Sequence, residues 1–159
     1  MISSFKGEYR FLSNFYPCIM IDSQFPKIVY PTSEHYYQAS KSDDPKIRLG
    51  IANIGSPAMA KRMGATILPS NWNTKKLEVM LRILRKKFEM GELETKLLRT
   101  FPKVLCEENF WHDNFWGICN CSSCATTVGK NTLGEFLMEV RHERMCQAKI
   151  RRRAWLRSA

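Results

Sequence analysis

Helix-start signals divide the middle of the chain into short segments. Residues 31–37 read Pro-Thr-Ser before an aromatic stretch, Asp44 precedes Pro45, and Ser56 precedes Pro57. A capping side chain followed by proline in the first turn is typical of a helix N-terminus. We therefore expect three short helices, which lie within residues 31–41, 42–54 and 56–65. Their caps are expected to be Thr32 or Ser33, Asp43 or Asp44, and Ser56 in turn.

Apolar residues at helical spacing predict three further helices in the second half of the chain. The clearest covers residues 74–90 and is ended by Gly91, a shorter one covers residues 92–101, and the last covers roughly 131–147. The buried faces are expected to be Leu77, Met80, Leu81, Leu84 and Phe88 in the first of these helices, and Leu133, Phe136, Leu137 and Val140 in the last.

Near the N-terminus, residues 18–22 and 27–30 are rich in β-branched and aromatic residues and flank the turn sequence Ser-Gln-Phe-Pro. This pattern predicts a β-hairpin, which we expect Pro31 to end. Residues 106–130 are expected to form a long loop, and loops of that length are usually functional or tied down. The sequence predicts an α+β fold: a predominantly helical single domain over residues 1–147 with a small N-terminal hairpin, followed by a basic tail over residues 148–159.

The composition favours an anionic partner. The chain has 159 residues, is 44% hydrophobic, and carries a formal net charge of +10, which suits nucleotides, phosphosugars or nucleic acid. It contains no apolar run long enough to span a membrane and no signal-peptide pattern, so a cytoplasmic protein is expected. Two interpretations of the basic tail remain open, a frayed and solvated end of the chain and a nucleic-acid contact.

One helical stripe combines an acid and an amine. Glu34, Gln38 and Lys41 stand at positions i, i+4 and i+7, with Tyr37 beside them. The stripe is either a solvated surface with an ordinary charge pair or the wall of a cleft. The neighbouring hairpin, dense in aromatic residues, favours the cleft.

A second group of candidate functional residues lies in the long loop. Asp113 stands among aromatic residues in the sequence FWHDNFWG at residues 110–117. It either caps a turn in a hydrophobic patch or is a desolvated acid in an aromatic box suited to a nucleobase and to proton transfer. The sequence GKNTLG follows, and the backbone amides around Gly129 and Asn131 are a candidate seat for a phosphate at the start of the last helix.

The cysteines offer a metal site. Without an export signal, disulfides are not expected. Cys119, Cys121 and Cys124 supply three thiolates, and a tetrahedral zinc site would take a fourth ligand from Cys106, Cys146 or His112. Such a zinc would staple the loop rather than take part in chemistry. The alternative is a loop of free thiols.

Five sequence blocks together resemble the NADAR family, also called YbiA-like. They are FLSNFYP at residues 11–17, PTSEHYYQASK at 31–41, LRKKF at 84–88, DNFWG at 113–117 and GKNTLGEFLMEVR at 129–141. The order and spacing match over nearly the whole chain before the tail. The cysteine-bearing stretch after Trp116 departs from the family's shorter glycine-rich loop, and the tail is an addition.

The resemblance implies N-glycosidase activity on the bond between ribose C1 and a base or amine nitrogen. The implied substrate is a phosphoribosylamino-pyrimidine intermediate of riboflavin biosynthesis or ADP-ribosyl-guanine in DNA, and no cofactor is required for the chemistry. The implied catalytic residues are Glu34, Lys41 and Asp113. The residues expected to contact substrate are Ser13, Asn14, Tyr37, Gln38, Trp116, Gly117 and Asn131.

A chemical reason supports pairing an amine with an acid. A neutral Lys41 could attack C1 of the ring-opened sugar to form a Schiff base, with Glu34 carrying the proton. Two other classes of function remain open. One is a non-catalytic module that binds ADP-ribose or a nucleotide, and the other is a small zinc-stapled nucleic-acid-binding protein.

Overall fold

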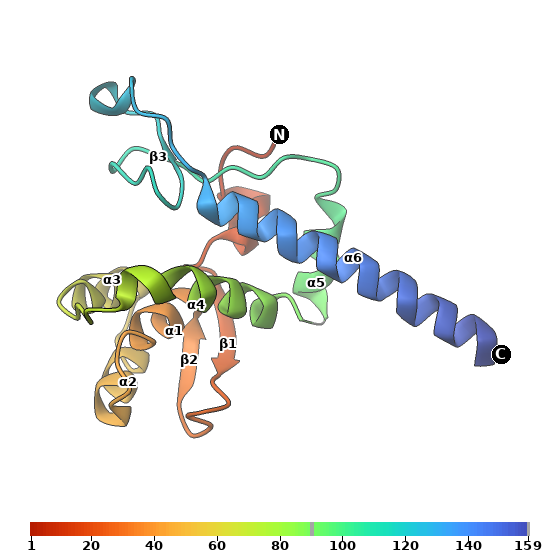
Figure 1. The fold of residues 1–159 in the computed structure, drawn as a ribbon, viewed down its shortest axis with the longest axis horizontal. Coiled ribbons are helices and arrows are strands. Elements are labelled where there is room, and N and C mark those ends of the chain that lie inside the picture. Colours follow the sequence, from red (N-terminus) through yellow and green to blue (C-terminus); the bar gives the residue numbers. More distant parts are fainter. Residues whose placement is uncertain (90, 159) are drawn as a thin grey trace. The chain divides into compact units, whose positions relative to one another are not determined.

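The computed structural model describes residues 1–89 and 91–158, and it confirms the predicted fold class, mainly helical with an N-terminal hairpin (Figure 1). Residue 90, the predicted end of one helix, lies outside the described residues. In chain order the elements are the 3-10 helix η1 (Gly7–Leu12), β1 (Pro17–Ile21), β2 (Val29–Thr32), α1 (Ser33–Ala39), α2 (Pro45–Ala52), α3 (Pro57–Ala65), α4 (Trp72–Lys87), α5 (Glu92–Arg99), β3 (Glu108–Asn109), β4 (Ile118–Cys119), the 3-10 helix η2 (Ser122–Cys124) and α6 (Thr132–Ser158).

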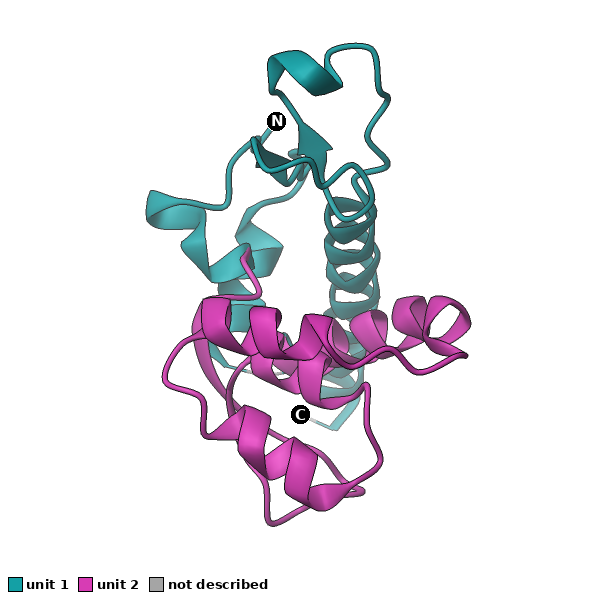
Figure 2. Ribbon diagram, turned by 90° about the vertical axis from the view of Figure 1, so that its left-hand side faces the viewer, with its two compact units in different colours: residues 1–12, 88–159 teal, residues 13–87 magenta. Residues whose placement is uncertain are grey.

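The chain divides into two compact units (Figure 2). Unit 1 contains residues 1–12 and 88–159, and unit 2 contains residues 13–87. Within the part of the chain that the structure describes, no helix is both long and apolar enough to cross a membrane.

In unit 2, β1 and β2 pair as an antiparallel hairpin with an irregularity in β1 between Pro17 and Met20. The expectation that Pro31 ends the hairpin is wrong, because β2 runs through it and Thr32 pairs with Pro17. Proline is tolerated there because each strand of a two-stranded sheet has an unpaired edge. The Thr32 hydroxyl then accepts a hydrogen bond from the His35 amide and caps α1, as predicted.

Helix α1 forms the centre of unit 2. It packs against the hairpin and against α2, α3 and α4, and all seven of its residues are buried. A buried ion pair joins the hairpin to α2, since Arg48 Nη1 lies 3.0 Å from Asp22 Oδ2. Removing one partner of such a pair costs about 3–5 kcal/mol, so the pair fixes α2 beside the hairpin. Asp44 and Ser56 cap α2 and α3 as predicted.

Helix α4 begins two residues and ends three residues earlier than predicted, and the predicted buried face is confirmed in part. Met80, Leu84 and Phe88 are buried as predicted, whereas Leu77 is 40% exposed. Val79, Ile83 and Lys87 are buried in addition. Leu81 is half-buried. The helix turns this face toward α1 and β1, and the Lys87 ammonium donates a hydrogen bond to the Ser13 carbonyl. Lys87 can therefore be buried because its ammonium has an acceptor.

In unit 1, the N-terminal segment pairs in parallel with the segment that follows α5, through Ile2 and Leu105. Helices α5 and α6 pack together, and Leu133, Leu137 and Val140 of α6 are buried as predicted. Phe136 is only half-buried. Helix α6 continues beyond the predicted end at residue 147 to Ser158, so the basic tail forms the outer end of this long helix (Figure 1).

Residues 106–130 form a loop with little regular structure, as expected. The strands β3 and β4 pair in parallel, with Glu108 opposite Ile118 and Asn109 opposite Cys119. The short helix η2 follows β4 and carries Cys124.

Candidate functional site

In unit 2 the acid and the amide of the predicted stripe contact each other. Gln38 Nε2 donates a hydrogen bond of 2.7 Å to Glu34 Oε1, and both side chains are buried. The Glu34 amide donates to the Asn14 carbonyl, which attaches the loop before the hairpin to the start of α1. This face is therefore buried, and the surface interpretation of the stripe is wrong.

Lys41 lies just beyond the C-terminal end of α1, because the helix ends at Ala39 and Ser40 is its C-cap. Its ammonium donates a hydrogen bond of 2.6 Å to the Gly64 carbonyl and lies 5.7 Å from the centre of the Trp72 ring. Burial lowers the pKa of Lys41 below its ordinary value, and the nearby charge of Glu34 opposes that shift. Burial therefore makes the neutral form of this amine more accessible than it is in an exposed lysine.

Gly64 permits α1 and α3 to approach closely. A Cβ atom at this position would lie 2.6 Å from Gln38 Cδ and 2.7 Å from Gln38 Cβ. Such separations are well below the normal carbon–carbon contact of about 3.5 Å. Gly64 therefore leaves the space that Gln38 occupies, and its carbonyl is the acceptor for Lys41.

Aromatic and amide groups complete the arrangement in unit 2. The rings of Tyr37 and Trp72 lie 5.2 Å apart at a tilt of 58°. Asn14 Oδ1 and Gln38 Oε1 have no hydrogen-bond partner among the described residues, although both side chains are at least 92% buried. Buried polar atoms are usually satisfied, so these two oxygens are candidates to accept hydrogen bonds from a ligand. Ser13 Oγ instead accepts a hydrogen bond from the Phe15 amide.

In unit 1, Asp113 caps a tight turn. Its Oδ1 atom accepts hydrogen bonds from the amides of Phe115 at 3.1 Å and Trp116 at 2.8 Å. The aromatic box predicted around it is only partly built, because Phe110 is 66% and Trp111 58% exposed. Phe115 and Trp116 are half-buried and pack edge to face. The capping role, one of the two interpretations of Asp113, is confirmed.

Gly117 allows two segments of the loop to approach. A Cβ atom there would collide with the Glu107 carbonyl oxygen and would lie 2.9 Å from Asn109 Nδ2. Its neighbour Trp116 packs against Phe136 of α6. Both residues shape this part of unit 1.

The expected phosphate seat at the start of α6 is wrong. The amides of residues 130–133 donate to the carbonyls of Asn114, Gly117, Phe115 and Trp116 in turn, so they are occupied by the loop. Asn131, which has a φ of 50°, uses its side chain to bind the backbone of Leu105 and Glu107. This residue joins the loop to α6.

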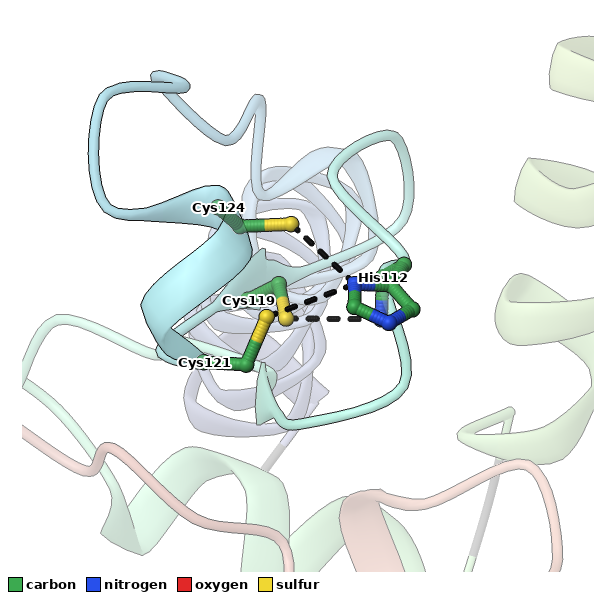
Figure 3. Close-up of side chains that lie close together, drawn as sticks. All are labelled: His112, Cys119, Cys121 and Cys124. Atoms are coloured by element: carbon green, nitrogen blue, oxygen red, sulfur yellow. Dashed lines mark hydrogen bonds between the residues drawn. The ribbon is translucent and has the colours of Figure 1, made fainter.

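Four side chains converge on one point in the loop, as Figure 3 shows. His112, Cys119, Cys121 and Cys124 have ligand atoms that all lie within 4.8 Å of one another, and together they could hold a metal ion. His112 Nδ1 lies 3.3 Å from both Cys121 Sγ and Cys124 Sγ. Of the three candidates for the fourth ligand, the structure selects His112 over Cys106 and Cys146.

Sequence reasoning missed two members of the unit 2 arrangement, Trp72 and the Gly64 carbonyl. Neither follows from helical spacing, because both reach Lys41 only through the packing of α1 against α3 and α4. Glu34, Gln38 and Lys41 lie in unit 2, and Asp113 lies in unit 1. The prediction that all the acids and the amine meet at one sugar carbon stays a prediction.

Comparison with known proteins identifies one family, and the match includes residues of both units. The NADAR domain model matches residues 3–144. The N-glycosidase YbiA of Escherichia coli (strain K12) is 40% identical over 146 residues, which cover 88% of this chain and 84% of that protein.

Two further similarities extend this finding. A riboflavin biosynthesis protein of Vibrio vulnificus is 36% identical over 140 residues, which cover 86% of this chain and 36% of that protein. The NMR structure of the E. coli protein YbiA superposes with a TM-score of 0.74 at 36% identity, covering 94% of this chain and 89% of that one.

Proposed function

Because the chain belongs to the NADAR family and is an N-glycosidase of the YbiA type, we propose that it hydrolyses the C1–N bond of a phosphoribosylamino-pyrimidine. This substrate class is supported by the related riboflavin biosynthesis proteins of Vibrio vulnificus and Zea mays, in which the matching segment is part of a longer protein. ADP-ribosyl-guanine in DNA is the second candidate, and the net charge of +10 favours it.

The observation that carries the proposal is the half-buried amine of Lys41 in the same unit as the buried Glu34–Gln38 pair. In a ribosylamine, the ring-opened form has an imine at C1. A neutral Lys41 Nζ adds to C1, the substrate amine departs with a proton, and water then hydrolyses the lysine Schiff base to release the sugar. The net reaction consumes one water and regenerates the free amine.

We assign Glu34 the role of proton carrier in this chemistry. Its carboxylate accepts the proton that Lys41 loses on attack and returns one to the departing nitrogen. Gln38 holds the carboxylate through the 2.7 Å hydrogen bond. The half-buried Trp72 ring, which packs against the buried Tyr37, is the proposed stacking surface for a base.

Asp113 is proposed to stabilise the positive charge that develops on the sugar as the C1–N bond breaks. Its turn is rigidly bonded, which suits an electrostatic role because a preorganised charge needs no rearrangement during the reaction. This role rests on the family resemblance of the Asp-Asn-Phe-Trp-Gly block.

We also propose that the ion held by His112 and the three cysteines is Zn²⁺, and that it is structural. In a tetrahedral site with Zn–S of about 2.3 Å and Zn–N of about 2.0 Å, the nitrogen and sulfur ligands stand about 3.5 Å apart. The 3.3 Å separations at His112 agree with this value. Four protein ligands leave no open position for a water or substrate, as in structural zinc sites.

Product analysis tests the substrate. The purified protein is offered the phosphoribosylamino-pyrimidine and, separately, a DNA oligomer carrying ADP-ribosyl-guanine, and the released sugar is identified. Turnover of the pyrimidine alone is expected. Release from DNA, with a rate that falls steeply with salt, would shift the assignment to the second candidate, and binding of both without turnover would indicate a binding module.

Borohydride trapping tests the lysine. Reduction during turnover is expected to fix the sugar on the wild-type protein at Lys41, identified by peptide mass. The Lys41→Ala variant should form no adduct and lose at least about a hundredfold in kcat. Lys61→Ala, which removes an exposed lysine on α3, is the matched control. Trapping on another lysine would overturn the mechanism.

A further inference from the structure

The loop that carries Asp113 has an unusual connection. Strands β3 and β4 are parallel neighbours, and only residues 110–117 join them. Parallel neighbours ordinarily need a crossover of a dozen residues or more. Two paired positions also supply little stability of their own. Other restraints must therefore hold the connection closed.

Hydrogen bonds supply part of this restraint, and they centre on Asp113. Asn109 Oδ1 accepts from the Asp113 amide at 3.2 Å, and Asn109 Nδ2 donates to the Asp113 carbonyl at 2.7 Å. Asn114 Oδ1 accepts from the Cys119 amide at 2.9 Å. The turn is thus tied to β3 on one side and to β4 on the other.

Apolar packing restrains only the second half of the connection, because Trp116 packs against Phe136 whereas Phe110 and Trp111 are mostly exposed. In addition, His112 adopts a φ of 66°, a left-handed conformation that costs about 1–2 kcal/mol for a residue with a side chain. That conformation brings the His112 amide within 3.3 Å of Cys119 Sγ, while its ring reaches the other two thiols. The strained residue is therefore a ligand of the cluster, and it immediately precedes Asp113.

We propose that the metal bound by His112, Cys119, Cys121 and Cys124 fixes the Asp113 turn, so that metal occupancy sets the turnover of the enzyme. The four ligands are positioning residues, since they act through Asp113 and not on the substrate. The inference rests on the proposed function in one respect, that Asp113 stabilises the transition state. An interaction made only in the transition state affects kcat and leaves KM nearly unchanged.

The first test compares Cys124→Ser with Cys146→Ser, a control that removes an exposed cysteine outside the cluster. Elemental analysis is expected to find about one zinc per chain in the wild type and the control and less than about a tenth of that in Cys124→Ser. The kcat of Cys124→Ser should fall by about 10–100-fold, with KM within about threefold. If this variant does not fold, chelator-treated wild type with and without restored zinc gives the same comparison.

The second test separates positioning from general damage. Hydrogen exchange should quicken over residues 109–119 in Cys124→Ser, while α1 and the buried middle turns of α6, around Leu137 and Val140, keep their protection. In an Asp113→Asn background, adding Cys124→Ser should lower kcat little further, because both changes act through one group.

Several outcomes would overturn the inference. One is a wild-type protein that binds no metal and instead forms a Cys121–Cys124 disulfide. Another is loss of the metal without faster hydrogen exchange over residues 109–119. A third is that the two substitutions of the double variant lower kcat additively. A wild type without any turnover would instead refute the proposed function, while the metal and exchange measurements would still decide whether the ion holds the turn.

Discussion

The chemistry proposed for Lys41 depends on its surroundings, not on its residue type. Its amine is half-buried, donates to a backbone carbonyl and lies over an aromatic ring. Burial disfavours its charged form, and Glu34 limits that effect without cancelling it. A lysine in this position is neutral more often than an exposed lysine at the same pH.

The pH dependence of the reaction should report this lysine. We expect kcat/KM to rise with pH along a limb that lies below the ordinary lysine value of about 10.4, because the neutral amine is the reactive form. Glu34→Gln removes the charge that raises the pKa of Lys41, so the limb should move to lower pH although kcat falls. Rate profiles of both proteins provide the measurement. Movement of the limb to higher pH would contradict the conclusion that the charge of Glu34 raises the pKa of Lys41.

His35 makes stability depend on pH. Burial lowers its pKa, and its ring is held by Thr32 Oγ1 at 2.8 Å and the Ile54 carbonyl at 3.0 Å. The unfolded chain therefore binds more protons than the folded chain, so stability increases with pH in this range. The contribution is complete above about pH 6.5 and is lost as the pH falls through the folded value.

Thermal unfolding between pH 8 and pH 5 tests this prediction. The wild type should lose stability on acidification, and His35→Gln should lose much of that dependence while being less stable at pH 8. His142→Gln, at an exposed position of α6, is the control and should behave as the wild type. Equal pH slopes for the wild type and His35→Gln would contradict the role given to His35.

At the scale of elements, local sequence signals predicted where most helices begin, but predicted the buried face of each helix only in part. Thr32, Asp44 and Ser56 cap their helices as expected because capping is a local interaction. The face of α4 was misjudged at Leu77, since burial depends on neighbours distant in sequence. The end of α6 was misplaced because its basic last turns have no apolar stripe, although they continue the helix.

In the candidate site, too, local interactions could be predicted from the sequence and long-range contacts could not. The stripe of Glu34 and Gln38 could be predicted because helical spacing places them together. The acceptor at Gly64 could not, because it belongs to another helix. His112 was one of three possible fourth ligands, and only the three-dimensional fold, which includes a left-handed backbone at this residue, shows that it lies beside the three thiols.

Because Gln38 packs directly against Gly64, adding one methyl group at residue 64 should lower both activity and stability. Gly64→Ala should displace Gln38, lower kcat by about tenfold or more, and destabilise the protein by about 1–3 kcal/mol. Gly50→Ala is the matched control, since its Cβ would meet no atom within 4 Å and alanine favours the helix by about 0.5–1 kcal/mol. Enzyme assays and thermal unfolding of both variants check the prediction. Equal behaviour of the two variants would refute the packing argument.

At the scale of the whole molecule, the family match extends over residues 3–144 and therefore includes both units. It ends before the basic part of α6, in which residues 149–158 are exposed. The fold could thus be predicted from the resemblance, whereas the helical state of the tail could not. The charge in this segment is separate from the residues proposed for catalysis.

Truncation after residue 147 tests whether the basic tail contributes to stability or catalysis. Stability should change by less than about 1 kcal/mol, because the Arg151–Glu94 ion pair is surface-exposed at its arginine. Turnover of the phosphoribosylamino-pyrimidine should be unchanged. Affinity for any DNA ligand should fall together with its salt dependence. Thermal unfolding, enzyme assays and binding titrations at two salt concentrations give the answer, and a loss of pyrimidine turnover would assign the tail a catalytic role.

The complete burial of α1 has a consequence for genetic experiments. A helix without a solvent-facing side offers no neutral position, so a saturation library over residues 33–39 should show depletion at every site. Residues that never meet a substrate would score as badly as Glu34. Growth-based maps of this segment would therefore measure folding and chemistry together, and only assays on purified variants would tell them apart.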